Sequence, residues 1–143
     1  MKIYGILSSA NFQKINWFCE HANISVINLN YGGVHGKTQT TEFKDMNPNS
    51  RIPVIDDNNF ILYESNAILR YLSKKFDILV EEKKEISGKI DQWIDWGSFT
   101  FASPCSLLTA HKLSLPQDQR DELISEKAKN CLLYTSDAAD DLI

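Results

Sequence analysis

The first half of the chain alternates between short apolar runs and segments with helical spacing. We expect strands at Lys2–Leu7 and at Ile24–Leu29, the second of them buried because it is dense in apolar side chains. Between them, apolar residues recur at helical spacing, at Phe12, Ile15, Phe18, Cys19 and Ala22. Asn23 is a suitable residue to end this helix. A strand, a helix and a strand in this order predict a parallel pair of strands joined by a helical crossover.

The stretch from Asn47 to Phe76 carries a second pattern. Two apolar runs, Ile52–Ile55 and Phe60–Leu62, flank a turn made of Asp and Asn residues, which predicts a β-hairpin. A helix follows, with apolar residues at Ala67, Ile68, Tyr71 and Leu72. Ahead of the hairpin, Thr40–Met46 predicts one or two helical turns that end before a proline.

The second half of the chain has helical patterns. A long helix is expected from Glu82 to about Leu108, and Pro104 should kink or end it because proline lacks a backbone donor and clashes with the preceding turn. After a break at Ser114-Leu115-Pro116, another helix is expected from Gln117 to about Leu132.

Charge and hydropathy exclude two classes of partner. The net charge of −4 and the lack of a basic patch argue against a nucleic-acid partner. No apolar run is long enough to span a membrane, and Met1–Tyr4 has strand character without the apolar region of a signal peptide. We therefore expect a cytoplasmic protein without a membrane partner.

The cysteines and histidines give no metal signature. Cys19, Cys105 and Cys131 are odd in number and widely spaced, which favours reduced thiols over a disulfide framework or a zinc site. His21 and His111 belong to no ligand pattern, so no metal is expected.

Four features follow one another in a fixed order: Ile52-Pro53, the hairpin, Glu64-Ser65 and the helix, within the sequence NPNSRIPVI…LYESNAILRYL. Together they resemble the glutathione S-transferase family. The N-terminal domain of that family has a thioredoxin-like fold, a cis-proline after a hydrophobic residue and a Glu-Ser pair at a helix start. A buried hairpin and an ordinary capped helix would explain each piece alone, but the ordered combination favours the family.

The resemblance implies the fold class and the domains. Residues 1–77 are expected to form an α/β domain of thioredoxin-like fold, with a mixed sheet and the order β-α-β-α-β-β-α. A linker at 78–81 and a partial all-α domain at 82–132 should follow. The ending, 133–143, matches nothing expected there and is interpreted as a non-native or disordered tail. If the helical domain is incomplete, several aromatic side chains should be more exposed than usual: Trp93, Trp96, Phe99 and Phe101.

The resemblance also implies a catalytic hydroxyl. In serine-type members it lies six residues before an apolar position of the first helix, which selects Ser9 if that position is Ile15, and Asn11 and Lys14 then fit a bacterial pattern. Ser8 is the alternative, and either serine could simply cap the helix. Tyr4 would suit a tyrosine-type enzyme but also suits a strand.

Further contacts with glutathione are implied by the same resemblance. Glu64 and Ser65 should hold its γ-glutamyl end, and the main chain of Ile52, turned outward by a cis bond to Pro53, should pair with its cysteinyl segment. His35 and Arg51 are candidates for its glycyl carboxylate, although both could be plain surface residues.

The implied activity is conjugation of the glutathione thiolate to a small hydrophobic electrophile, with glutathione as co-substrate, no cofactor and a homodimeric assembly. One alternative is a non-catalytic binding or assembly module of the same fold. A second alternative is a glutathione-dependent thiol transferase or peroxidase, which is disfavoured because no Cys-x-x-Cys is present and Cys19 falls on the inner helix face.

Overall fold

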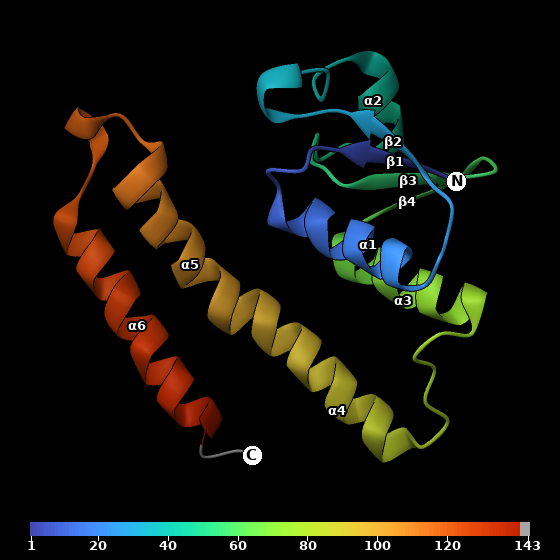
Figure 1. Cartoon of the computed structure of the whole chain (residues 1–143). Coiled ribbons are helices and arrows are strands. Elements are labelled where there is room, and N and C mark those ends of the chain that lie inside the picture. The colour runs from blue at the N-terminus through green and yellow to red at the C-terminus, as the bar shows by residue number, and fades with distance from the viewer. Residues whose placement is uncertain (141–143) are drawn as a thin grey trace. The chain divides into compact units, whose positions relative to one another are not determined.

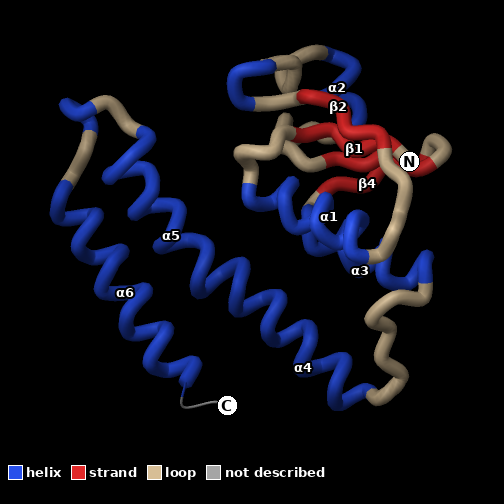
Figure 2. The backbone as a smooth tube through the Cα atoms, viewed as in Figure 1, coloured by secondary structure: helices blue, strands red, loops and turns tan. Residues whose placement is uncertain are grey.

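The computed structural model describes residues 1–140 of the chain, which form two compact units. The first unit is Met1–Val80, and the second begins at Glu81. Figure 1 shows the elements of each unit, and Figure 2 separates helices, strands and loops by colour. Among the described residues, no helix combines the length and the apolar character that crossing a membrane requires.

The first unit is built on a four-stranded mixed sheet with the strand order β2-β1-β3-β4. β1 and β2 are parallel, whereas β3 is antiparallel to both β1 and β4. The strands are β1 (Lys2–Gly5), β2 (Ile27–Asn30), β3 (Val54–Asp57) and β4 (Phe60–Tyr63). The element order β1-α1-β2-α2-β3-β4-α3 confirms the expected thioredoxin-like arrangement.

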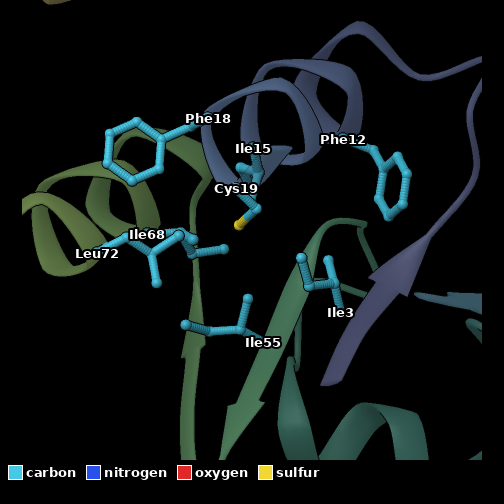
Figure 3. Close-up of a cluster of buried hydrophobic side chains, with 8 residues drawn as sticks. All are labelled: Ile3, Phe12, Ile15, Phe18, Cys19, Ile55, Ile68 and Leu72. Atoms are coloured by element: carbon cyan, nitrogen blue, oxygen red, sulfur yellow. The ribbon is translucent and has the colours of Figure 1, made fainter. Parts of the chain in front are cut away.

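Side-chain alternation along the strands gives the sheet two apolar faces. On one face, Ile3 and Ile55 pack with α1 (Ala10–His21) and α3 (Ser65–Phe76), as Figure 3 shows. The neighbouring residues Tyr4 and Val54 point to the opposite face and pack with Phe43 of α2 (Thr41–Met46). The helices therefore cover both sides of the sheet: α1 and α3, predicted from apolar spacing, lie on one side, and α2 lies on the other (Figure 1).

The local signals for these elements are realised. Asn23 ends α1 with a positive φ of 54°, and Thr40 caps α2 by accepting a hydrogen bond from the N–H of Phe43 at 3.4 Å. Asn58 and Asn59 form the hairpin turn, both with positive φ. The Ile52-Pro53 bond is cis, as expected.

The prediction for the second strand was wrong in extent and in burial. β2 begins only at Ile27, and Ile27 is 59% exposed. The physical reason is its place at the edge of the sheet, where it pairs only with β1. Dense apolar residues indicate a strand, but they do not distinguish an edge strand from a central one.

The second unit consists of a long helical stretch that turns back into one further helix. The stretch comprises α4 (Lys84–Asp95), the π-helical η2 (Trp96–Phe101), α5 (Ala102–Thr109) and the π-helical η3 (Ala110–Ser114). A short 3-10 turn, η4 (Gln117–Gln119), leads to α6 (Glu122–Asp140), which packs against α5.

Pro104 does not end the long helix, contrary to one of the two expected outcomes. It lies in the first turn of α5, directly after η2, and its side chain is buried. A π-helical turn shifts the backbone hydrogen-bond pattern by one residue. The helix can therefore continue past proline, which has no N–H to donate.

The last helix begins and ends later than its pattern indicated. Its start is set by Asp121, whose carboxylate accepts hydrogen bonds from the N–H groups of Leu123 at 2.8 Å and Ile124 at 3.2 Å. The helix extends past Leu132 to Asp140. Of the predicted tail, residues 141–143 lie outside the described part of the chain.

Candidate functional site

A cavity of about 480 Å³ opens in the first unit where three segments of the chain meet. Its walls come from the start of α1, the loop between β2 and α2, and the loop before β3. The lining residues are Ser9 and Asn11, then Gly32, Gly33, Thr38 and Gln39, then Asn49, Ser50, Arg51 and Ile52. Four of the residues predicted for the site, Ser9, Asn11, Arg51 and Ile52, thus share one cavity.

Ser9 lies at the N-terminus of α1 but does not use its side chain as a cap. Its carbonyl accepts hydrogen bonds from the N–H groups of Phe12 at 3.0 Å and Gln13 at 2.9 Å, while its hydroxyl makes no capping bond. The hydroxyl therefore lies at the positive end of the helix dipole and is not used in a capping hydrogen bond. Ser8, the alternative, is exposed and does not line the cavity.

The loop before β3 is held by the buried side chain of Asn47, which was not among the residues predicted for the site. Asn47 donates from its amide to the carbonyl of Arg51 at 2.8 Å and accepts from the N–H of Asn49 at 3.0 Å. Within residues 1–140, no hydrogen bond engages the main-chain N–H or C=O of Ile52. These groups are available to an extended peptide, in the way an added strand uses a sheet edge.

The start of α3 adjoins the cavity through Asn11. Ser65 is buried and donates from its hydroxyl to the side-chain oxygen of Asn11 at 3.2 Å. Glu64, the residue before α3, is exposed and has a positive φ of 69°. The fold thus brings Ser9, Asn11 and Ser65 together from segments far apart in the sequence.

His35 lies in the exposed 3-10 turn η1 (Gly33–His35) and does not line the cavity. Four polar residues that were not predicted for the site, Thr38, Gln39, Asn49 and Ser50, do line it. Only the closeness of Asn49 to Arg51 in the sequence could have indicated that a further residue lines the cavity, since loop residues show no periodicity.

Cys19 is unsuited to nucleophilic chemistry. Its side chain is buried in the core between α1 and α3 (Figure 3). Burial, with a smaller contribution from Glu20, raises the pKa of the Cys19 thiol to about 11. No cysteine lines the cavity, and within residues 1–140 no group of three or more His, Cys, Asp or Glu side chains could hold a metal ion.

The chemistry of the cavity suits a short anionic peptide. Arg51 supplies a cation that can pair with a carboxylate, Ile52 supplies main-chain hydrogen-bonding groups, and Ser9 supplies a hydroxyl at a helix N-terminus. Most of the remaining lining is polar.

Comparison with known proteins places this chain in a family. Residues 1–74 match the family described as glutathione S-transferase, N-terminal domain. GstB, a glutathione S-transferase of Escherichia coli K12, is 26% identical over 134 residues, covering 90% of this chain and 64% of GstB. Human glutathione S-transferase theta-1 is 28% identical over 86 residues, covering 58% of this chain and 36% of that protein.

Among solved structures, the theta class glutathione S-transferase of Xanthomonas axonopodis pv. citri, with glutathione bound, superimposes with a TM-score of 0.88 at 30% identity. The match covers 96% of this chain and 69% of that one, so the chain spans about two thirds of the length of these bacterial relatives. Since the family match extends over more than half of the sequence and agrees with the fold, the chain belongs to the glutathione S-transferase family.

Proposed function

We propose that the cavity binds glutathione and that the hydroxyl of Ser9 activates its thiol for transfer to a small hydrophobic electrophile. The observation that carries the proposal is the convergence of Ser9, Arg51 and Ile52 on one cavity. Glutathione acts as co-substrate, and no further cofactor is needed.

Ionisation of the thiol is the step that the protein must assist. A free thiol has a pKa of about 8.5, so only a few per cent is thiolate at neutral pH. A hydroxyl that donates a hydrogen bond to the sulfur stabilises the anion, and one pKa unit corresponds to about 1.4 kcal/mol, the size of one such bond. The N-terminus of α1 adds a favourable dipole beside the sulfur.

The chemical step then balances simply. The thiol proton passes to solvent, the thiolate forms a carbon–sulfur bond with the electrophile, and the displaced group or double bond takes the electron pair. The protein contributes position and charge stabilisation.

The cavity also suggests how glutathione is oriented. The main chain of Ile52 pairs with the cysteinyl segment, and Arg51 meets the glycyl carboxylate, with Thr38 and Gln39 as neighbouring donors. Ser65 and Glu64 hold the γ-glutamyl end, beside Asn11.

Calorimetric titration of glutathione into the chain, combined with the thiolate absorbance of the bound ligand, tests the proposal. Ser9→Ala should leave binding largely intact but raise the pKa of the bound thiol by about one unit, a tenfold loss of thiolate. Ser8→Ala is the matched control and should behave as the unchanged chain. Equal thiol pKa values in both variants, or absence of glutathione binding, would contradict the proposal.

A second candidate is a glutathione-binding module without turnover. It is favoured by the polar lining, since apart from Ile52 and two glycines every residue that lines the cavity is polar or charged, which suits an apolar electrophile poorly. Retention on immobilised glutathione without conjugation of several electrophiles would favour this module.

A homodimer remains a prediction that sedimentation analysis would check.

A further inference from the structure

Lys14, a lysine on α1, contacts the first turn of α3 through a partly buried hydrogen bond. Lys14 is partly buried, and its ammonium donates to the side-chain oxygen of Asn66 at 2.5 Å. Asn11, one helical turn earlier on the same face of α1, accepts from Ser65. Consecutive residues at the start of α3 are therefore each tied to α1 by a side chain.

The charged group that acts on Lys14 belongs to the candidate γ-glutamyl site. Partial burial lowers the pKa of the Lys14 ammonium, and the nearby Glu64 carboxylate opposes that effect by favouring the charged form. Glu64 and Asn66 are the two residues on either side of Ser65. A cation that interacts with both lies beside the end of α3 at which an anion would be held.

Partial burial of an ammonium costs desolvation free energy, and a nearby anion can offset that cost. Glu64 is one such group, yet it is exposed and can be solvated by water. A ligand carboxylate at Ser65 would be a second anion, and it would meet both the ammonium of Lys14 and the positive end of the α3 helix dipole.

Resting on the proposed function, we infer that Lys14 is a positioning residue that selects thiols with a free carboxylate at the γ-glutamyl end. It does so by adding positive charge at the start of α3 and by holding Asn66 through their hydrogen bond. Thiols that lack this carboxylate gain nothing from Lys14.

The test compares two ligands by calorimetric titration of the full chain. One is glutathione, and the other is γ-aminobutyryl-cysteinyl-glycine, which differs only by loss of the γ-glutamyl carboxylate. Lys14→Met should weaken glutathione binding roughly tenfold and leave binding of the analogue unchanged. Lys14→Arg should retain most of the preference for glutathione, because it keeps the charge.

Lys44→Met, an exposed lysine on α2, is the matched control for loss of one positive charge and should change neither affinity. Equal weakening of both ligands by Lys14→Met would overturn the inference in favour of plain structural support, and no change in either would overturn it directly. If Lys14→Met unfolds the chain, Lys14→Gln replaces it, and unfolding of both variants would likewise assign Lys14 to structure. Failure of the unchanged chain to bind glutathione would refute the proposed function itself, which is a separate outcome.

Discussion

At the scale of single residues, Asp57 is a buried carboxylate with two partners on α3. Its Oδ2 accepts a hydrogen bond from the hydroxyl of Tyr71 at 2.6 Å and another from the ammonium of Lys75. The hydrogen bond from Lys75, and then that from Tyr71, hold the pKa of Asp57 below its ordinary value, although burial opposes them. The end of β3 is thus tied to the middle and the last turn of α3.

Because the folded-state pKa of Asp57 is depressed, its contribution to stability should be present above the unfolded pKa, about 3.9, and lost as pH falls through the folded pKa. Asp57→Asn should lower the free energy of unfolding by about 1–3 kcal/mol near neutral pH, since a charge-assisted acceptor is replaced by an amide. The difference between the two proteins should shrink on acidification. Urea unfolding measured across the acidic range checks this.

Asp56→Asn is the matched control one residue earlier. Asp56 pairs with Lys2 at 3.4 Å in a more exposed position, and such a pair contributes about 0–1 kcal/mol. Its side-chain oxygen also accepts from the N–H of Asn59, a bond that the amide oxygen of the substituted side chain can keep. A pH dependence unchanged by Asp57→Asn, or matched by Asp56→Asn, would refute the role given to Asp57.

Of the residues predicted for the site, those at the start of α1 and just before β3 line the cavity, whereas His35, Pro53, Glu64 and Ser65 do not. Ser9, Arg51 and Ile52 were selected from a pattern, and all three line the cavity. Thr38 and Gln39 line it too, but their position depends on how the loop between β2 and α2 folds back, which no local spacing encodes. The role that each lining residue plays stays a prediction.

At the scale of elements, the loop between β2 and α2 depends on glycine. Gly32 has a φ of 82°, and a Cβ added there would lie 2.9 Å from Cδ1 of Ile52. Gly36 in the same loop has a φ of 58°, but an added Cβ would meet nothing within 4 Å. The two glycines share the strained backbone and differ in the contact with the site.

Alanine at either glycine should therefore destabilise the first unit by about 1–3 kcal/mol through its backbone alone. Only Gly32→Ala should also weaken glutathione binding, because the added methyl group would meet Cδ1 and Cγ1 of Ile52, at 2.9 and 3.3 Å, within the lining of the cavity. Calorimetric titration and urea unfolding of both variants measure the two effects separately. Equal effects on binding would show that the close approach to Ile52 is unimportant for the ligand.

Elements were predicted well where the pattern was local. The hairpin and α3 emerged because turn residues and apolar spacing act within a few positions. The burial of β2 was misjudged because it depends on which strands pair. The continuation of the helix past Pro104 was not predicted because π-helical turns have no spacing signature in the sequence.

At the scale of the whole molecule, buried apolar side chains are distributed unevenly between the two units. Among residues whose side chains are described, all of the buried apolar ones except Pro104 and Ala128 lie in the first unit. In the second unit large apolar side chains are exposed, including Phe99 at 78% and Leu113 at 74%. The exposure expected for the aromatic side chains there is met at Trp93, Phe99 and Phe101, while Trp96 is partly buried.

This imbalance predicts that the chain does not unfold in a single step. Hydrophobic burial is the main favourable term in folding, so the second unit should lose its structure at a lower urea concentration than the first. Hydrogen exchange followed by mass spectrometry, at increasing urea, can resolve this because peptides from α1 and α3 report the first unit and peptides from α5 and α6 the second. We expect protection to be lost from α5 and α6 first.

Leu72→Ala provides the control that separates the two transitions. Leu72 is fully buried in the cluster of α1, α3 and the sheet, so its truncation should lower the stability of the first unit by about 2–5 kcal/mol. Protection of α5 and α6 should be unaffected by that change if the units unfold independently. Simultaneous loss of protection in both units, shifted together by Leu72→Ala, would instead mean that they fold as one cooperative body.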